Sequence, residues 1–215
     1  RLRAARAALG AGERIAAANA LISTLEQLPE FLVDTHVAGY WAVGGELPLD
    51  IALGRLHARA QNYYLPVLAG GNLLKFGEWR PGISVHANRY GIPEPQCDAA
   101  TLFSATQIDL VLVPLLGFDR RGNRLGAGSG YYDLSFAFLR ATARQDTPLR
   151  FGICCPFTEM SDLAPQYVVV PLHFISTYRT VVASTPRPID IWCLTVKSDR
   201  HYRYTECLMG EASST

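Results

Sequence analysis

The sequence predicts an α/β fold, a single domain with a mostly parallel twisted sheet flanked by helices. Three observations predict it. Predicted strands alternate along the chain with predicted helices. The run Leu110–Val113 is continuously apolar, as in a strand that is buried on both faces. A glycine-rich segment follows this strand, on the carboxyl side where sheets of this class bind ligands.

The N-terminal half of the chain supplies the first elements. Leucine and isoleucine recur at helical spacing over residues 2–28, with a break near Gly10 and Gly12. The elements predicted next are a strand over 37–43, a helix over 49–60, a strand over 63–67, and a hairpin or short strands over 73–82.

The second half begins with an extended, turn-rich loop at Gly91–Pro95, because each proline restricts the residue before it. The elements predicted after this loop are a strand over 108–113, a helix over 131–143 that starts at the glycine-rich segment, and strands over 150–154 and 167–171. Ser184–Pro188 resembles a linker. We therefore predict a domain over 1–183 and a poorly ordered C-terminal extension over 184–215.

The composition is that of an ordinary globular protein. The chain has 215 residues, of which 49% are hydrophobic and 18% charged, and its formal net charge is +1. This balance argues against a broad basic surface for nucleic acid. We see neither an apolar run of about 18 residues that would span a membrane nor a signal peptide. The five cysteines lack a C-x-x-C pattern and are expected to be reduced. We expect a cytoplasmic monomer without nucleic-acid or membrane partners.

The segment from Arg124 to Asp133 carries the candidate chemistry. Its three glycines, Gly126, Gly128 and Gly130, alternate along five residues and let backbone N–H groups approach an anion. The arginine adds positive charge, and the carboxylate can hold magnesium. The segment is neither a Walker A loop, because no Gly-Lys-Ser/Thr follows, nor a Rossmann fingerprint, because the glycine spacing differs. It predicts a phosphate site.

The same segment resembles the signature of the 5-formyltetrahydrofolate cyclo-ligase family, also called methenyltetrahydrofolate synthetases. The matching residues are Pro114, Gly117-Phe118-Asp119 and Gly122-Asn123-Arg124-Leu125-Gly126-Ala127-Gly128-Ser129-Gly130-Tyr131-Tyr132-Asp133. Weaker matches are Gly45-Glu46, Leu65-Pro66, Phe76, Trp79 and Gly91-Ile92-Pro93-Glu94-Pro95, so the resemblance covers roughly residues 2 to 155. It implies a Rossmann-like fold.

The resemblance also implies a C–N bond-forming ligase. Such an enzyme converts the reduced folate 5-formyltetrahydrofolate to 5,10-methenyltetrahydrofolate and uses ATP and Mg²⁺, with release of ADP and phosphate. The γ-phosphoryl group passes to the formamide oxygen, the neighbouring amine attacks, and phosphate leaves. The protein contributes positioning and charge stabilisation.

Site residues follow from the resemblance, position by position. The residues expected to contact ATP are Arg124, Gly126, Ala127, Gly128, Ser129, Gly130, Tyr131 and Tyr132. Arg124 and Tyr132 are the expected catalytic residues, and Asp133 is the expected metal ligand. Two alternatives stay open: Tyr131 as a packing residue, and Asp133 as a residue that favours the helix N-terminus.

The folate is expected to contact a second group of residues. Glu46 is expected to accept hydrogen bonds from the pterin ring, Val43 to form an apolar contact, and Tyr90 to stack on the substrate. The alternative for Tyr90 is a loop anchor.

Both ends of the chain depart from the family pattern. The family's N-terminal basic residues that reach ATP are expected to lie upstream of Arg1. Near the C-terminal end, the family's second metal carboxylate falls on Val169, with Asp162 as a substitute from a shifted register. The altered region favours an alternative function, a catalytically impaired homologue that binds nucleotide or folate. A third hypothesis is a different α/β enzyme that acts on a phosphorylated metabolite.

Overall fold

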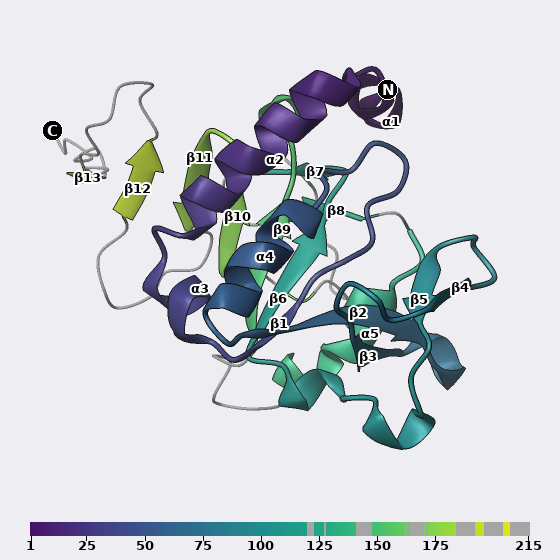
Figure 1. The fold of residues 1–215 in the computed structure, drawn as a ribbon. Coiled ribbons are helices and arrows are strands. Elements are labelled where there is room, and N and C mark those ends of the chain that lie inside the picture. The colour runs from purple at the N-terminus through teal and green to yellow at the C-terminus, as the bar shows by residue number, and fades with distance from the viewer. Residues whose placement is uncertain are drawn as a thin grey trace, which may run out of the picture.

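Helices and strands alternate along the chain in the computed structural model (Figure 1). The structure describes residues 1–119, 123–126, 128–140, 148–161, 163, 170 and 172–183, and the strands at 192–195 and 204–206. The described α-helices are α1 (Leu2–Ala7), α2 (Ala11–Leu25), α3 (Pro29–Val33), α4 (Asp50–Ala58) and α5 (Tyr131–Ser135). The described 3₁₀ helices are η1 (Gly70–Asn72), η2 (Ala99–Thr101), η3 (Ala105–Gln107), η4 (Ala137–Arg140) and η5 (Pro156–Thr158).

The strands are β1 (His36–Ala38), β2 (Asn62–Leu68), β3 (Leu74–Glu78), β4 (Val85–Ala87), β5 (Pro93–Pro95), β6 (Leu110–Pro114), β7 (Gly117–Phe118), β8 (Arg124–Leu125), β9 (Leu149–Ile153), β10 (Phe174–Ser176), β11 (Thr180–Ala183), β12 (Trp192–Thr195) and β13 (Tyr204–Glu206).

The main sheet confirms the predicted α/β class and its mostly parallel sheet. Its described strands lie in the order β13-β12-β11-β10-β9-β6-β1-β2-β3. Neighbours from β10 through β9, β6 and β1 to β2 are all parallel, whereas β3, β11, β12 and β13 join antiparallel at the two edges. Two small antiparallel pairs, β4 with β5 and β7 with β8, stand outside this sheet.

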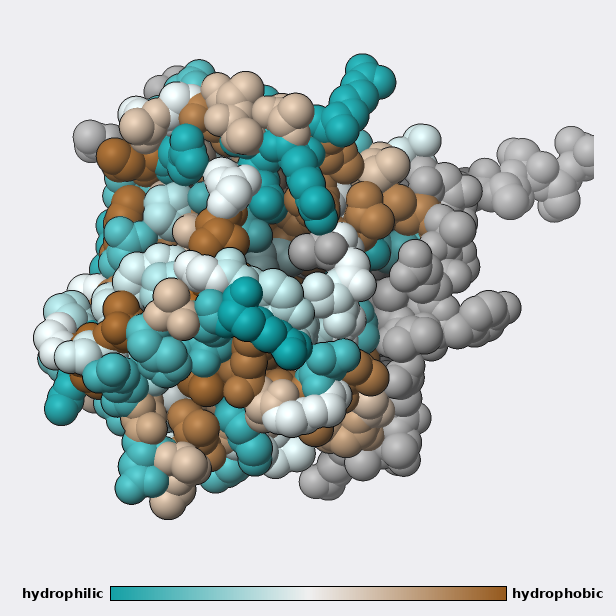
Figure 2. Space-filling model, turned by 90° about the vertical axis from the view of Figure 1, so that its right-hand side faces the viewer, coloured by the Kyte–Doolittle hydropathy of each residue, from teal (hydrophilic) through white to brown (hydrophobic). Residues whose placement is uncertain are grey.

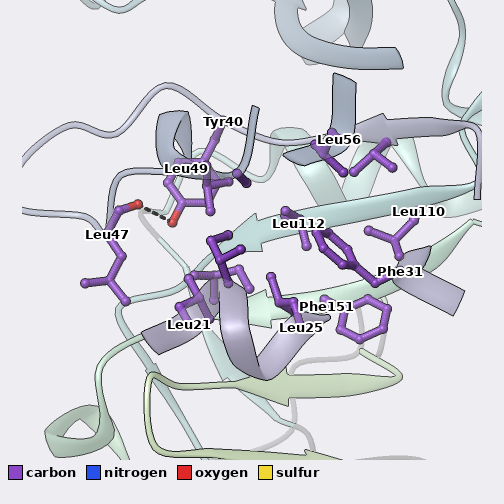
Figure 3. Packing of buried hydrophobic residues seen from close by; sticks show 14 of the residues in the cluster. Leu21, Leu25, Phe31, Tyr40, Leu47, Leu49, Leu56, Leu110, Leu112 and Phe151 are labelled. Atoms are coloured by element: carbon purple, nitrogen blue, oxygen red, sulfur yellow. Dashed lines mark hydrogen bonds between the residues drawn. The ribbon is translucent and has the colours of Figure 1, made fainter. Parts of the chain in front are cut away.

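Strand β6 is buried on both faces, as its apolar run predicts. Leu110 and Leu112 pack with residues of α2 and α4 in one core cluster (Figure 3). Val111 and Val113 point to the other side, into a second cluster that includes Phe136. Since side chains alternate along a strand, one apolar run supplies both cores. This strand therefore forms the centre of the fold.

The N-terminal helical region divides as the glycines predict. Helix α1 ends at Ala7, and Gly10 is the N-cap of α2, where its N–H bonds to Glu13 Oε2 at 2.9 Å. The predicted strand over 37–43 is shorter, because β1 ends at Ala38. Beyond it the chain folds back, with the Tyr40 hydroxyl donating to the Leu47 carbonyl at 2.8 Å (Figure 3). This returning loop becomes one wall of the site.

Other elements differ from the prediction in their length or in their type of secondary structure. The segment over 73–82, predicted as a hairpin or short strands, forms one short strand, β3, and the loop at 91–95 contributes β5. The helix predicted over 131–143 ends at Ser135 and continues as the 3₁₀ helix η4, with 141–143 outside the described residues.

Most of the strand predicted over 167–171 lies outside the described residues, as do Val169 and Asp162. In the region predicted as an extension, the described strand β12 pairs with β11 and with β13. The domain boundary at 183 stays a prediction. Within the described part of the chain, none of the helices has the length and apolarity needed to cross a membrane.

Candidate active site

The predicted site residues converge on one cavity of about 760 Å³. It lies between α1, the loop after β1, the β4–β5 pair and the segment from β8 to α5. The predicted residues that line it are Val43, Glu46, Tyr90, Arg124, Gly126, Gly128, Ser129, Gly130, Tyr131, Tyr132 and Asp133. Ala127 lies outside the described residues. Figure 2 looks onto the side that carries β4 and β5, where the surface is hollowed near its middle.

The glycine-rich segment owes its shape to backbone conformations that favour glycine. Gly128 has φ +101° and Gly130 has φ +68°, both in the left-handed region. Gly130 is the N-cap of α5, so the helix begins at Tyr131 as predicted. A Cβ atom added at Gly126 would meet nothing within 4 Å, and its φ is not left-handed. The described protein therefore does not itself require glycine at 126, whereas a ligand lying on the backbone there would.

Arg124 and Asp133 face each other across this segment. They form an ion pair with side chains only 6% and 16% exposed. The Val170 N–H also donates to Asp133 Oδ1 at 3.0 Å. Burial lowers the pKa of Arg124, while the neighbouring Asp133 and Tyr132 act in the opposite direction. The predicted anion group and the predicted metal ligand are thus direct partners.

The Arg124 side chain has unused hydrogen-bonding capacity. Its Nε atom is buried and has no hydrogen-bond partner in the described part of the chain. Leaving a buried donor unsatisfied costs about 1–3 kcal/mol. A phosphate oxygen placed beside Nε would supply the missing acceptor and add a charge-assisted bond. The donor set therefore fits a nucleotide phosphate.

Tyr132 lines the cavity as a neutral phenol. Burial, followed by the nearby Glu46 carboxylate, raises the pKa of Tyr132 well above that of an exposed tyrosine, although Arg124 lowers it. At neutral pH this side chain can donate a hydrogen bond to a developing negative charge. It is not suited to act as a base.

Glu46 stands opposite the glycine-rich segment, and its carboxylate faces Arg6 of α1. Glu46 Oε1 lies 3.5 Å from Arg6 Nη1, and Oε2 accepts the Val43 N–H at 3.1 Å. Burial raises the pKa of Glu46, while the Val43 hydrogen bond and Arg6 lower it. Sequence reasoning missed Arg6. Its signal was the spacing Leu2, Arg6, Leu9, which puts the arginine on the apolar face of the helical region.

Tyr90 and Tyr131 meet at the mouth of the cavity. Their hydroxyl oxygens are 3.3 Å apart and their rings make an edge contact at 6.2 Å. Arg89 donates to the Tyr131 hydroxyl and stacks on Tyr90 at 5.2 Å. Buried Glu94 holds this loop by accepting the Leu68 N–H at 3.0 Å and the Asn88 amide at 2.8 Å. Tyr131 therefore bridges two walls of the cavity.

The metal prediction concerns Asp133 alone among the described residues. Within the described ranges there is no group of three or more His, Cys, Asp or Glu side chains that could hold a metal ion. Mg²⁺ commonly binds through one or two carboxylates, with phosphate oxygens and water as its other ligands. A single carboxylate beside a phosphate site fits that pattern.

Comparisons with known proteins match most of the chain to one family. The sequence profile of the 5-formyltetrahydrofolate cyclo-ligase family matches residues 1–162. The 5-formyltetrahydrofolate cyclo-ligase of Mycolicibacterium smegmatis is 36% identical over 154 residues, which cover 68% of this chain and 76% of that protein. The enzyme of the same name from Haemophilus influenzae is 33% identical over 100 residues, covering 46% of this chain and only 54% of the relative's length.

A solved structure shares the fold. The 5,10-methenyltetrahydrofolate synthetase of Aquifex aeolicus has a TM-score of 0.72 and 24% sequence identity, and the match covers 93% of this chain and 94% of that one. At this identity the likeness concerns the fold alone.

Proposed function

The chain belongs to the 5-formyltetrahydrofolate cyclo-ligase family, and from this premise we propose that it converts 5-formyltetrahydrofolate to 5,10-methenyltetrahydrofolate at the expense of ATP. The observation that carries the proposal is the convergence of every described site residue predicted from the resemblance on a single cavity. The volume of about 760 Å³ is within the range of small-molecule sites, about 300–1,000 Å³.

The reaction joins phosphoryl transfer to ring closure. The formamide oxygen of the folate takes the γ-phosphoryl group and ADP departs. The neighbouring ring-forming amine then attacks the activated carbon and gives up its N–H proton to solvent, the C–N bond forms, and the C–O bond breaks with release of phosphate. Both steps develop or move negative charge at one oxygen, so donors placed near that oxygen lower the barrier.

The residues divide between the two substrates. Arg124 and the backbone N–H groups from Gly126 to Gly130 would bind and orient the phosphates, and Tyr132 would donate to the reacting oxygen. Asp133 would hold Mg²⁺ together with phosphate oxygens, and the ion would offset phosphate charge. Glu46 would accept hydrogen bonds from the N–H groups of the pterin edge, with Val43 against the ring and Tyr90 over it.

We also propose a cytoplasmic location and a monomeric state. Cys97, Cys154 and Cys155 are free thiols, which is the usual state in a reducing compartment.

The proposal is tested with purified protein, 5-formyltetrahydrofolate, ATP and Mg²⁺, by following the absorbance of the methenyl product. We expect product to form only when all components are present. Folded protein that binds both substrates and forms no product would instead support the impaired homologue. A family enzyme of known activity serves as the positive control.

A further inference from the structure

A buried arginine outside the glycine-rich segment contacts several segments that line the cavity. Arg6 of α1 is only 8% exposed. Its Nε donates to the Gly44 carbonyl at 3.1 Å, and its Nη1 donates to the Leu115 carbonyl at 3.3 Å. The same Nη1 lies 3.5 Å from Glu46 Oε1. One side chain thus connects α1, the loop after β1 and the segment after β6.

The loop that carries Glu46 is shaped to accept this contact. Gly44 and Gly45 both have left-handed backbone, with φ +56° and +81°. A Cβ atom at Gly45 would lie 2.8 Å from the Arg6 carbonyl oxygen, so the loop packs directly on the backbone of α1. Glu46 closes the turn, since its backbone N–H donates to the Val43 carbonyl at 3.1 Å. The position of Glu46 therefore depends on α1.

We propose that Arg6 is a positioning residue for the folate: it fixes the loop at residues 43–46 against the end of β6 and orients the ionised Glu46 carboxylate toward the pterin edge. This inference rests on the proposed function, because it assigns Arg6 a role in that same site. Arg6 would act through Glu46 and the loop, without contact with ATP. Its Nε and Nη1 atoms are already engaged by protein acceptors.

The charges around Glu46 make the role measurable by pH. The groups that face it are Arg6 from α1, Tyr40 from its own loop and Tyr132 from α5. The two tyrosines are neutral near pH 7, because burial raises the pKa of each. Arg6 is thus the group whose charge favours the ionised carboxylate. Without Arg6, the pKa of Glu46 rises further. When the pH is lowered, Glu46 then becomes protonated, and folate binding is lost, at a higher pH than in the wild type.

The test measures the dissociation constant of 5-formyltetrahydrofolate without ATP, and separately that of a non-hydrolysable ATP analogue, over a range of pH. The variants are Arg6→Met and Glu46→Gln, singly and together. Arg14→Met is the matched control, because it removes an equal charge from the neighbouring helix. Arg14 donates a hydrogen bond to the Leu9 carbonyl at 2.7 Å and does not line the cavity.

We expect Arg6→Met to raise the dissociation constant of 5-formyltetrahydrofolate about tenfold or more, the size of one lost charge-assisted interaction. The dissociation constant of the ATP analogue should stay unchanged. Its loss of folate affinity on acidification should begin at a higher pH than in the wild type. In the Glu46→Gln background, Arg6→Met should have a much smaller effect, since the group through which it acts is gone.

Different failures are distinguishable. Wild-type protein that does not bind the folate overturns the proposed function itself. Normal folate binding by Arg6→Met, or a loss confined to the ATP analogue, overturns the positioning role while the proposed function stands. If Arg6→Met does not fold, Arg6→Lys is measured. Lysine offers a single ammonium group for three acceptors, so folate affinity should fall below that of the wild type, and equality with the wild type would overturn the inference.

Discussion

Arg124 and Asp133 are ion-paired across the glycine-rich segment, and both side chains are largely buried. The residue proposed for the phosphates and the residue proposed for the metal are therefore coupled before any ligand binds. Removing one leaves the other charge poorly compensated at the edge of the core, so each substitution affects stability as well as chemistry.

The first prediction concerns this pair. Arg124→Ala should lower turnover about tenfold to a hundredfold and lower the free energy of unfolding by about 3 kcal/mol, because Asp133 loses its partner. The double variant Arg124→Ala with Asp133→Asn should regain part of the stability and none of the activity. Urea unfolding and the methenyl absorbance assay measure the two effects.

Arg55→Ala is the control for that experiment. Arg55 pairs with Glu26 on the surface, with 45% of its side chain exposed, so its loss should cost at most about 1 kcal/mol and leave turnover unchanged. Equal loss of stability in Arg55→Ala and Arg124→Ala would contradict the account of the buried pair.

A pair of glycine substitutions separates backbone strain from ligand contact. Gly130→Ala should destabilise the protein by about 1–2 kcal/mol, since its φ is +68°. Gly126→Ala should leave the unfolding midpoint unchanged, because a Cβ there meets nothing within 4 Å in the described chain, but it should raise the KM for ATP. An unchanged KM in a folded Gly126→Ala protein would remove position 126 from the phosphate site.

Tyr132→Phe removes one hydroxyl from the lining of the cavity. We expect kcat to fall while the KM values change little, since the proposed hydrogen bond strengthens only as charge develops on the reacting oxygen. In the wild type, the raised pKa of Tyr132 keeps this group protonated, so no loss of kcat from its ionisation should occur up to about pH 10. A kcat equal to that of the wild type in Tyr132→Phe would exclude the role.

A pH effect on stability is expected far from the cavity, at Asp34. Burial, then the charges of Asp109 and Glu30, raises the pKa of Asp34 to about 6. The folded state therefore holds this proton more tightly than the unfolded chain does. Protonation of Asp34 therefore favours folding at low pH, and this contribution to stability is lost as the pH rises from about 4 through about 6.

Asp34→Asn should therefore be more stable than the wild type at pH 7, with a smaller difference at pH 4. Urea midpoints at intervals between these values measure it. Asp34 Oδ2 is a buried atom without a hydrogen-bond partner in the described residues, which agrees with the expected penalty on its charged form. A wild type that gains stability relative to Asp34→Asn as the pH rises would contradict the sign.

The inner strands β1, β2, β6 and β9, and the phosphate side of the cavity, were predictable from local pattern. The apolar run at Leu110–Val113 predicts a central strand because burial on both faces requires it. The motif from Arg124 to Asp133 predicts the phosphate side of the cavity because its residue types are close in sequence. Glu46 was found through the resemblance alone.

What escaped prediction depends on contacts between distant segments. Strand β10, Phe174–Ser176, is three residues long and gains its place by pairing with β9, which no local pattern reveals. Tyr131 joins the β4–β5 loop through Arg89 and Tyr90, which lie about forty positions earlier in the chain. The ion pair of Arg124 with Asp133 depends on how the glycines turn the backbone between them.

The most direct test of the central claim is the ratio of phosphate released to methenyl product formed, measured together in one reaction with 5-formyltetrahydrofolate, ATP and Mg²⁺. The account predicts one phosphate per product, no product without ATP and no phosphate without folate. Product formed without ATP, or phosphate released without ring closure, would contradict it.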